Sequence, residues 1–330
     1  MVENTRHIAV SAVVTTFKRP DDVRRALASV VSQTYPLAEI IVIEDGPATE
    51  LGEWIHRNYG NRVRYIAHGV NKGLPAARNT GLRESTGDYI AYLDDDDVWK
   101  PERIRKQVDA LSALPVSERK QIGVVTCKTE MHFPKSGRIS VRPYGNVGPL
   151  KEAIIREGAR TPSSSFLFAR EALERVGGFD ESLASSVDHD IWMALAVEGY
   201  SGAAADEPLV VHFDRFARST AMSSTLRRIQ GVRQYVSKWQ PTYRDWLGSH
   251  EGDARMRRYV ATVMGHLAAG KLATGVFDEA WKAYRTAAAD SKLPWYASGV
   301  VVSRVFFLWA QQLLPSRIIA VAKTMRRSPG

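Results

Sequence analysis

The chain has 330 residues, of which 44% are hydrophobic and 25% are charged. This length suits one large domain or a domain with a smaller appendage, and the globular composition excludes a low-complexity or disordered chain. The single cysteine, Cys127, excludes an internal disulfide framework and a metal site built from several cysteines.

The net charge of +9 is unevenly distributed along the chain. Residues 215–330 contain 19 Lys and Arg against 6 Asp and Glu, a balance of +13, which leaves −4 for residues 1–214. A basic C-terminal region indicates either an anionic partner, such as a membrane surface or a phosphate-bearing acceptor, or a solvated helical surface. We expect no nucleic-acid partner, because the chain has no recognisable binding module and no dense interleaving of aromatic and basic residues.

The sequence contains no targeting or membrane-spanning signal that we recognise. Its N-terminus lacks the charged stretch, apolar run and cleavage site of a secretory signal. No window reaches the roughly 20 uninterrupted apolar residues that span a bilayer, and the nearest candidate, 295–310, contains Arg304. We therefore expect a cytoplasmic protein, with peripheral contact at the inner face of the membrane if its C-terminal helices bind lipid.

The first third of the chain alternates strand and helix patterns. Strands are expected over 8–16, 39–43, 63–67 and 88–93, with helices starting at Pro20, over 73–85 and starting at Pro101. The short β-branched runs are typical of buried parallel strands, and proline followed by acids is typical of a helix start. The pattern predicts an α/β fold with a doubly wound, mostly parallel sheet flanked by helices. Ligands bind such sheets beyond the carboxyl ends of the strands, which places Thr16, Asp45 and 94–97 at one edge.

The remainder of the chain is less regular and then helical. We expect strands over 122–131, 163–169 and 209–213, a loop over 138–149 and a helix over 188–199. After about residue 218 the pattern is helical, with a helix pair over 255–274 and 278–290. The predicted organisation is one domain over 1–217 and a basic helical region over 218–330.

Four consecutive aspartates, Asp94 to Asp97, directly follow the fourth predicted strand. Side chains alternate faces in an extended segment, so Asp94 and Asp96 are expected on the same side. Converging carboxylates repel each other and need positive charge, which a divalent cation such as Mg²⁺ or Mn²⁺ supplies. The alternative is a solvated acidic turn that caps the helix starting at Pro101.

Four segments, in order, resemble the family 2 glycosyltransferases. They are VSAVVTTFKRPDDVRRALASVVSQTYPLAEIIVIEDGP, NKGLPAARNTGL, GDYIAYLDDDDVWKPERI and VGGFDESLASSVDHDIWMAL, and together they cover about residues 8–200. The resemblance implies a GT-A fold over 1–217. It also implies an inverting transferase that moves a sugar from a nucleotide-diphosphate donor to an acceptor hydroxyl.

The same resemblance implies roles for individual residues at the predicted sheet edge. The resemblance implies that Asp96 and Asp94 bind the metal, Mn²⁺ or Mg²⁺. UDP is the expected nucleotide by family frequency, with dTDP and GDP left open. The residues implied in donor binding are Thr16, Phe17, Glu44, Asp45, Arg78, Asp94 and Asp95.

An inverting transfer also requires a general base, because the acceptor hydroxyl must lose its proton during attack. By motif position the base is Asp188, with Asp190 as the alternative. Asp188 could instead cap the helix that it begins. The family commonly has Glu-Asp here, whereas this chain has Val187-Asp188.

Three other functions remain alternatives to an active transferase that adds single sugars to a glycan or glycolipid. A non-catalytic nucleotide-sugar sensor or scaffold is disfavoured because Asp94, Asp96 and Asp188 are all present. A nucleotidyltransferase is disfavoured because no glycine-rich loop follows the first strand. A processive synthase is disfavoured because the chain has no Q-x-x-R-W sequence.

The amphipathic pattern over 295–327 suits docking on a membrane surface, or a helix pair packed on the catalytic domain.

Several conspicuous residues are given ordinary roles. We expect His189 and His212 to be structural histidines, and Asp97 to turn away from the site. The serines at 163–165 are not predicted to include a nucleophile, since no His-Asp arrangement accompanies them.

Overall fold

The computed structural model describes residues 7–134, 137–213, 224–273 and 276–290. The chain divides into two compact units. The first comprises Met1–Met131, Ser140–Ser182 and Val187–His212, and the second comprises His132–Ile139, Leu183–Ser186 and Phe213–Gly330. The predicted boundary between residues 217 and 218 falls within 214–223, which lies outside the described residues.

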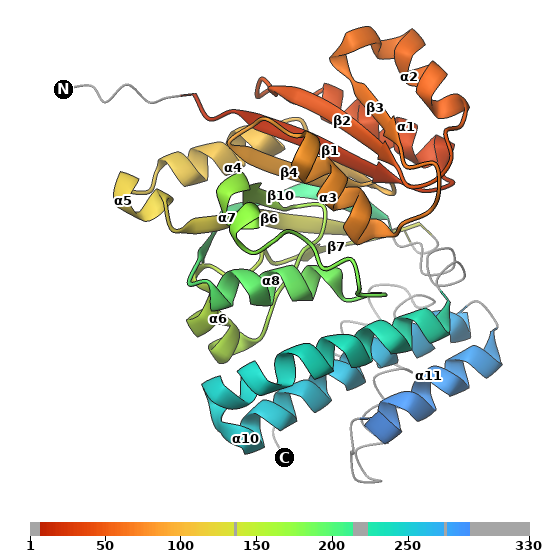
Figure 1. The fold of residues 1–330 in the computed structure, drawn as a ribbon, viewed down its shortest axis with the longest axis vertical. Coiled ribbons are helices and arrows are strands. Elements are labelled where there is room, and N and C mark those ends of the chain that lie inside the picture. The colour runs from red at the N-terminus through yellow and green to blue at the C-terminus, as the bar shows by residue number, and fades with distance from the viewer. Residues whose placement is uncertain (1–6, 135–136, 214–223, 274–275, 291–330) are drawn as a thin grey trace. The chain divides into compact units, whose positions relative to one another are not determined.

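A mixed sheet organises the first unit (Figure 1). Its parallel part has the order β3-β2-β1-β4, made of β1 (Val10–Thr16), β2 (Glu39–Glu44), β3 (Arg64–Ala67) and β4 (Tyr89–Asp94). The order continues through β9 (Leu167–Ala169), β6 (Ile122–Phe133), β10 (Ser201–Phe213) and β5 (Asp97–Trp99). In this second part β9 is antiparallel to both β4 and β6, and β5 is antiparallel to β10. The predicted α/β fold is confirmed, and its parallel pairing belongs to the first four strands.

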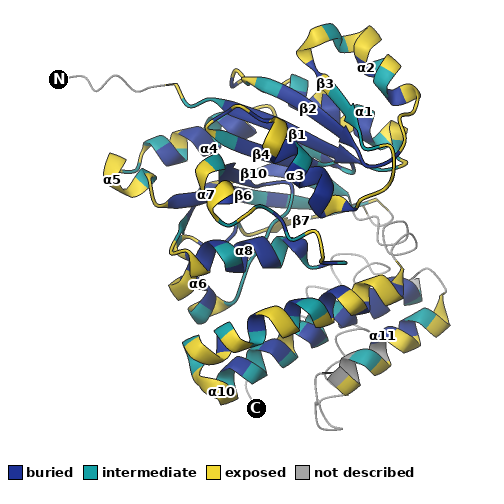
Figure 2. Ribbon diagram, in the orientation of Figure 1, coloured by how far each residue is buried: buried dark blue, intermediate teal, exposed yellow. Residues whose placement is uncertain are grey.

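Helices cover both faces of the parallel strands. The apolar faces of α1 (Pro20–Val31), α2 (Glu50–Tyr59) and α4 (Arg103–Ser112) share one core with alternate residues of the strands. Leu27, Ile55 and Ile104 lie in this core and are almost completely buried. Figure 2 shows the central strands β1, β2 and β4 coloured mainly as buried. On β1, Val10, Ala12 and Val14 join this core, as the two-residue side-chain period of a strand requires. The opposite face of the sheet is contacted by α3 (Leu74–Glu84).

The less regular middle of the chain differs from the sequence prediction. The segment expected as a loop contains β7 (Arg138–Arg142) and β8 (Gly148–Pro149), which pair with β6 and β10. The strand expected over 163–169 is confined to β9, while the last strand begins at Ser201 rather than at residue 209. Strand partners from distant sequence decide these boundaries, and local composition does not reveal such partners. The remaining helices are η1 (Gly60–Arg62), α5 (Val116–Arg119), α6 (Leu150–Glu157), α7 (Arg170–Arg175) and α8 (Val187–Val197).

The described residues of the second unit from 225 onward are helical, as predicted for the C-terminal region. It contains α10 (Thr225–Ala273) and α11 (Phe277–Asp290), and α10 is interrupted at Gly248, whose φ of 78° is non-helical. The unit also includes the short segment 183–186. Within it, the Ala184 amide donates to Gln234 Oε1 at 3.1 Å and Ser185 Oγ donates to the Arg228 carbonyl at 3.2 Å.

In the part of the chain that the structure describes, no helix is long and apolar enough to cross a membrane. The amphipathic segment over 295–327, to which membrane docking was assigned, lies outside the described residues.

One close approach gives a test of the packing between α3 and β1. A Cβ added to Gly81 would lie 2.4 Å from Val13 Cγ1, well inside van der Waals contact. We expect Gly81→Ala to lower the free energy of unfolding by about 1–3 kcal/mol, because overpacking forces helix and sheet apart. Urea denaturation followed by circular dichroism would measure the change.

The control is Gly265→Ala, since a Cβ at this position in α10 meets nothing within 4 Å. Alanine in a helix interior is expected to be neutral or to stabilise by up to about 1 kcal/mol. Equal losses in the two variants would contradict the close packing of α3 on β1.

Candidate active site

The parallel register aligns the carboxyl ends of three strands. Thr16 on β1 pairs with Glu44 on β2, and Thr15 pairs with Asp94 on β4. The Asp45 amide continues this alignment by donating to the Thr16 carbonyl at 2.8 Å. The polar residues that follow the strands are therefore brought to one edge of the sheet, as the sequence predicted.

The four aspartates do not share one face, because β4 ends at Asp94. Asp95 and Asp96 form a turn, and Asp97 begins β5. Asp95 and Asp96 both accept hydrogen bonds from Arg19 Nη1, at 2.9 Å each. The strand alternation from which Asp94 and Asp96 were expected to point the same way stops at Asp94, and the two residues have different partners.

Asp95 is the best-connected carboxylate of the turn. Its Oδ2 accepts from Thr16 Oγ1 at 2.8 Å, in addition to the Arg19 contact at Oδ1. The Phe17 amide points to the same Oδ2 at 3.4 Å. Phe17 itself is half-buried, with Lys18 Nζ 5.1 Å from the centre of its ring. Three of the residues assigned to donor binding, Thr16, Phe17 and Asp95, are thus brought together.

Crowding of negative charge is strongest at Asp96. Burial and the neighbouring carboxylates of Asp97, Asp94 and Asp95 raise the pKa of Asp96 to about 7, although Arg19 acts in the opposite direction. Burial also raises the pKa of Asp94 and of Asp95. Within the described residues no group of three or more His, Cys, Asp or Glu side chains is arranged to hold a metal ion.

Arg78 of α3 connects two elements of the predicted site. Its side chain is 1% exposed, and its Nη1 donates to Asp188 Oδ1 at 2.5 Å while its Nη2 donates to Asp94 Oδ1 at 3.0 Å. Burial alone would lower the pKa of Arg78, but Asp188 and Asp94 raise it, so the guanidinium is held charged. Its Nε has no hydrogen-bond partner among the described residues. Both terminal nitrogens are therefore committed to carboxylates of the protein.

Asp188 and Asp190 lie on the same helix, α8, but in different environments. The Asp188 side chain is 27% exposed and its contact with Arg78 uses Oδ1 only. Among the described residues its Oδ2 has no hydrogen-bond partner. Asp190 is 2% exposed. Of the two candidates for the base, Asp188 is the one whose carboxylate is accessible.

Glu44 and Asp45 are occupied by contacts within the protein. Asp45 Oδ1 accepts from the Lys72 amide at 2.8 Å and its Oδ2 accepts from the Gly73 amide at 2.8 Å, so this carboxylate holds the turn that begins α3. Glu44 accepts from Thr49 Oγ1 at 3.0 Å and from the Tyr65 hydroxyl. Both side chains lie near the site, but their polar atoms have partners other than a ligand.

Three features of this edge were not predicted from the sequence. Arg19 pairs with Asp95 and Asp96, and its position directly before a helix start, beside the predicted site, was an available signal. Asp97 is buried instead of turning outward, and it pairs with His212 Nδ1 at 2.8 Å and with Ser164 Oγ at 2.6 Å. Asp97 raises the pKa of His212, against the lowering effect of its burial. No local pattern could have predicted the contacts of Ser164.

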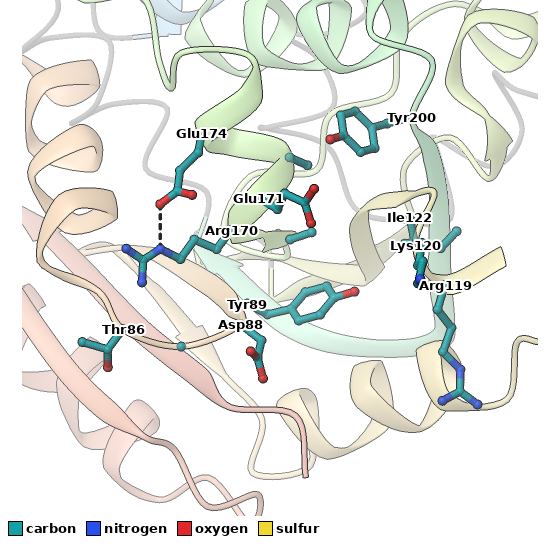
Figure 3. A pocket seen from close by; sticks show the side chains of 13 residues that line it. Thr86, Asp88, Tyr89, Arg119, Lys120, Ile122, Arg170, Glu171, Glu174 and Tyr200 are labelled. Atoms are coloured by element: carbon teal, nitrogen blue, oxygen red, sulfur yellow. Dashed lines mark hydrogen bonds and ion pairs between the residues drawn. The ribbon is translucent and has the colours of Figure 1, made fainter. Parts of the chain in front are cut away.

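A separate cavity of about 370 Å³ lies at the other end of β4 (Figure 3). Tyr89, Tyr200 and Glu171 line it, and Arg170 at its wall pairs with Glu174 at 2.8 Å. Because Thr86 to Tyr89 form the start of β4 and the segment before it, this cavity is distinct from the carboxyl edge.

Comparisons with known proteins bear on the same residues. Residues 11–138 match the family model described as Glycosyl transferase family 2. They contain the carboxyl ends of β1, β2 and β4 and all four aspartates. The likeness to glycosyl transferase family 2 therefore extends over the region that carries the candidate site. An uncharacterized glycosyltransferase of Rickettsia prowazekii is 31% identical over 202 residues, covering 58% of this chain and 60% of that relative. The chain thus spans less than two thirds of the relative's length.

Two solved structures show that this chain has the GT-A fold. The structure of S. aureus TarS residues 1–349 with UDP-GlcNAc has a TM-score of 0.55 at 13% identity and covers 92% of this chain and 90% of that one. A mannosyltransferase of Pyrobaculum calidifontis, in complex with GDP-Man and Mn²⁺, has a TM-score of 0.51 at 18% identity and covers 94% and 88%. At these identities the likeness extends to the fold alone.

The charge crowding around Asp96 predicts a pH-dependent stability. With a pKa of about 7 in the folded state against an ordinary value of 3.8, Asp96 keeps a proton that the unfolded chain releases. Its contribution to stability is fully present only below pH 3.8 and is lost progressively between pH 3.8 and 7. We therefore expect Asp96→Asn, which stays neutral, to raise the melting temperature relative to the parent clearly more at pH 8 than at pH 5.

Melting curves at the two pH values, recorded with EDTA, would measure this difference. Asp109→Asn, at an exposed position of α4, is the control and should give the same small difference at both pH values. An Asp96→Asn effect that is equal at pH 5 and pH 8 would contradict the charge crowding.

Proposed function

We propose that this protein is an inverting glycosyltransferase that moves a sugar from a nucleotide-diphosphate donor to an acceptor hydroxyl. The observation that carries the proposal is the pairing of Asp188 with Arg78, which also holds Asp94. This contact joins a half-exposed carboxylate on α8 to the acidic end of β4. A candidate base is thereby brought beside the candidate donor site.

Asp188 is proposed to act as the general base. Arg78 occupies Oδ1 and leaves Oδ2 available to accept the proton of an acceptor hydroxyl. The hydroxyl oxygen forms a bond to the anomeric carbon while the bond from that carbon to the phosphate oxygen breaks, and the nucleoside diphosphate departs with the electron pair. One displacement of this kind inverts the configuration at the anomeric carbon.

Asp96 is proposed as the main ligand of a divalent cation, Mn²⁺ or Mg²⁺. The crowded, buried carboxylates around it favour positive charge at this position. Asp94 was also assigned to the metal, but both its oxygens lie within 3.4 Å of Arg78 Nη2, so Asp96 is the stronger ligand. Magnesium commonly takes one or two carboxylates and completes its shell with phosphate oxygens and water, which suits a site of so few ligands. When bound, the cation would neutralise charge on the diphosphate.

The donor is proposed to bind beside Thr16, Phe17 and Asp95. An aromatic ring and a carboxylate that accepts from N–H or hydroxyl groups are suited to a nucleoside. Glu44, Asp45 and Arg78 would support this pocket indirectly, because their polar groups are held by protein partners. UDP is the nucleotide proposed first, and UDP-GlcNAc and GDP-Man are the donors present in the two similar structures.

The acceptor is proposed to be a glycan or glycolipid hydroxyl in surface polysaccharide assembly, met in the cytoplasm. The basic region after residue 215 would suit an anionic acceptor or membrane surface. A non-catalytic nucleotide-sugar-binding protein or scaffold is the competing proposal. The accessible carboxylate of Asp188 favours the enzyme.

A thermal-shift screen would test donor and metal together. UDP-, dTDP- and GDP-sugars, each with Mn²⁺, Mg²⁺ or EDTA, should include at least one nucleotide that raises the melting temperature only with metal. Asp96→Asn should abolish that shift, and Asp109→Asn should retain it. No shift with any nucleotide and metal would count against both the enzyme and the sensor.

The role of Asp188 is tested by Asp188→Asn. We expect sugar transfer or donor hydrolysis to fall by about 10²–10⁴-fold, because amide nitrogen and oxygen cannot take the acceptor proton. The thermal shift caused by donor and metal should remain close to that of the parent. Glu198→Gln, at an exposed position just beyond the end of α8, is the control. Retained transfer in Asp188→Asn, or full loss in both variants, would contradict the assignment.

A further inference from the structure

Ser164 has an unusual backbone at a position with no room for solvent. Its φ is +60°, in the left-handed region that non-glycine residues rarely adopt, and the residue is 1% exposed. A residue in this conformation persists only where its surroundings enforce it. The chemistry proposed for the site does not use Ser164, so the conformation calls for a separate explanation.

Three side chains hold the backbone of this segment through consecutive carbonyl groups. Trp99 Nε1 donates to the Ser164 carbonyl at 2.9 Å, Gln107 Nε2 donates to the next carbonyl, Ser165, at 2.8 Å, and Arg103 Nη2 donates to Phe166 at 2.8 Å.

These three anchors also support one another. The Arg103 guanidinium stacks on Trp99, 3.9 Å from the ring centre, and all three side chains are fully or almost fully buried. Arg103 and Gln107 are four residues apart on α4 and therefore present their side chains on the same face. These contacts to the carbonyl groups of residues 164–166 therefore hold the left-handed turn at Ser164.

The conformation aims the Ser164 hydroxyl at both ends of the aspartate turn. Its Oγ donates to Asp97 Oδ2 at 2.6 Å and accepts from the Asp94 amide at 3.2 Å. His212 Nδ1 contacts the same Asp97 oxygen at 2.8 Å. One buried hydroxyl therefore connects the last residue of β4 with the first residue of β5.

We propose that Ser164 is a positioning residue: its hydroxyl fixes the turn from Asp94 to Asp97, so that Asp95 and Asp96 are presented to the diphosphate and its cation. The inference rests on the proposed function for the identity of the ligand. The structural part, that the hydroxyl orders the turn, is independent of it. Ser164 itself is not expected to touch the donor.

The neighbouring serine is a matched control for this proposal. Ser165 is 0% exposed, but its Oγ donates only to the Pro162 carbonyl, at 2.6 Å, within its own loop. Ser164→Ala and Ser165→Ala each remove one buried hydroxyl from adjacent positions. A general loss of stability should therefore be similar in the two variants, whereas an effect on the aspartate turn should be confined to the first.

The experiment measures Mn²⁺ binding in the presence of UDP by electron paramagnetic resonance of free Mn²⁺, using the full chain. We expect the dissociation constant to rise at least tenfold in Ser164→Ala and to change less than twofold in Ser165→Ala. In transfer assays the Mn²⁺ concentration for half-maximal rate should rise in parallel, with a smaller effect on kcat at saturating metal. Equal dissociation constants in the two alanine variants would overturn the proposal.

A second variant separates the hydroxyl from the backbone. Ser164→Gly also lacks the hydroxyl but adopts a positive φ without strain. It should bind Mn²⁺ as weakly as Ser164→Ala. Restoration of binding by glycine would show that backbone conformation, not the hydroxyl, sets the turn, and would also overturn the proposal.

Amide hydrogen exchange distinguishes failure of this inference from failure of the proposed function. The Asp94 amide loses its acceptor in Ser164→Ala and should exchange faster than in Ser165→Ala, with no ligand present. If the parent binds no Mn²⁺ or nucleotide yet this difference appears, the proposed function fails and the ordering role of Ser164 stands. Unchanged exchange at Asp94 contradicts the ordering role whatever the parent binds.

Discussion

The site depends on how two arginines compensate a group of buried carboxylates. Asp94, Asp95 and Asp96 follow one another at the end of β4, where burial raises the pKa of each. Arg19 bridges Asp95 and Asp96, and Arg78 bridges Asp94 and Asp188. Arg78 is almost completely buried, so removing its carboxylate partners would leave an unpaired buried charge, which is strongly destabilising. The compensation is nevertheless incomplete at Asp96, and a cation would complete it.

The same interactions connect elements that are far apart in the sequence. Arg19 lies before α1 and Arg78 lies on α3, and both bind carboxylates at or just after the end of β4. Asp188 on α8 is connected to this edge through Arg78. The geometry of the site is therefore sensitive to the packing of these helices. Gly81 on α3 has no room for a Cβ beside Val13 of β1, so the helix that carries Arg78 packs closely on the sheet.

Glu44 and Asp45 lie at this edge of the sheet, but their carboxylates accept hydrogen bonds from other groups of the protein. Asp45 accepts hydrogen bonds from the backbone of Lys72 and Gly73, which begin the helix that carries Arg78. Charged acceptors of this kind make strong hydrogen bonds and define a turn well. A substitution of Asp45 would consequently act on Arg78 and through it on Asp188. The effect on activity would resemble that of losing a donor contact, although the cause is the position of a helix.

The sequence by itself determined the α/β class, the first four strands, the helical C-terminal region and the edge at which the polar residues gather. These features follow from local patterns, because β-branched runs, helix-start prolines and acids at strand ends act within a few residues. Tertiary structure alone decided which carboxylate pairs with which arginine. Alternation along β4 suggested that Asp94 and Asp96 act together, but the strand ends at Asp94, and Arg78 and Arg19 give the two residues different partners. The partners of Ser164, 65 to 70 residues away in sequence, leave no local trace, because such contacts depend on how β4, β5 and the segment before β9 pack together.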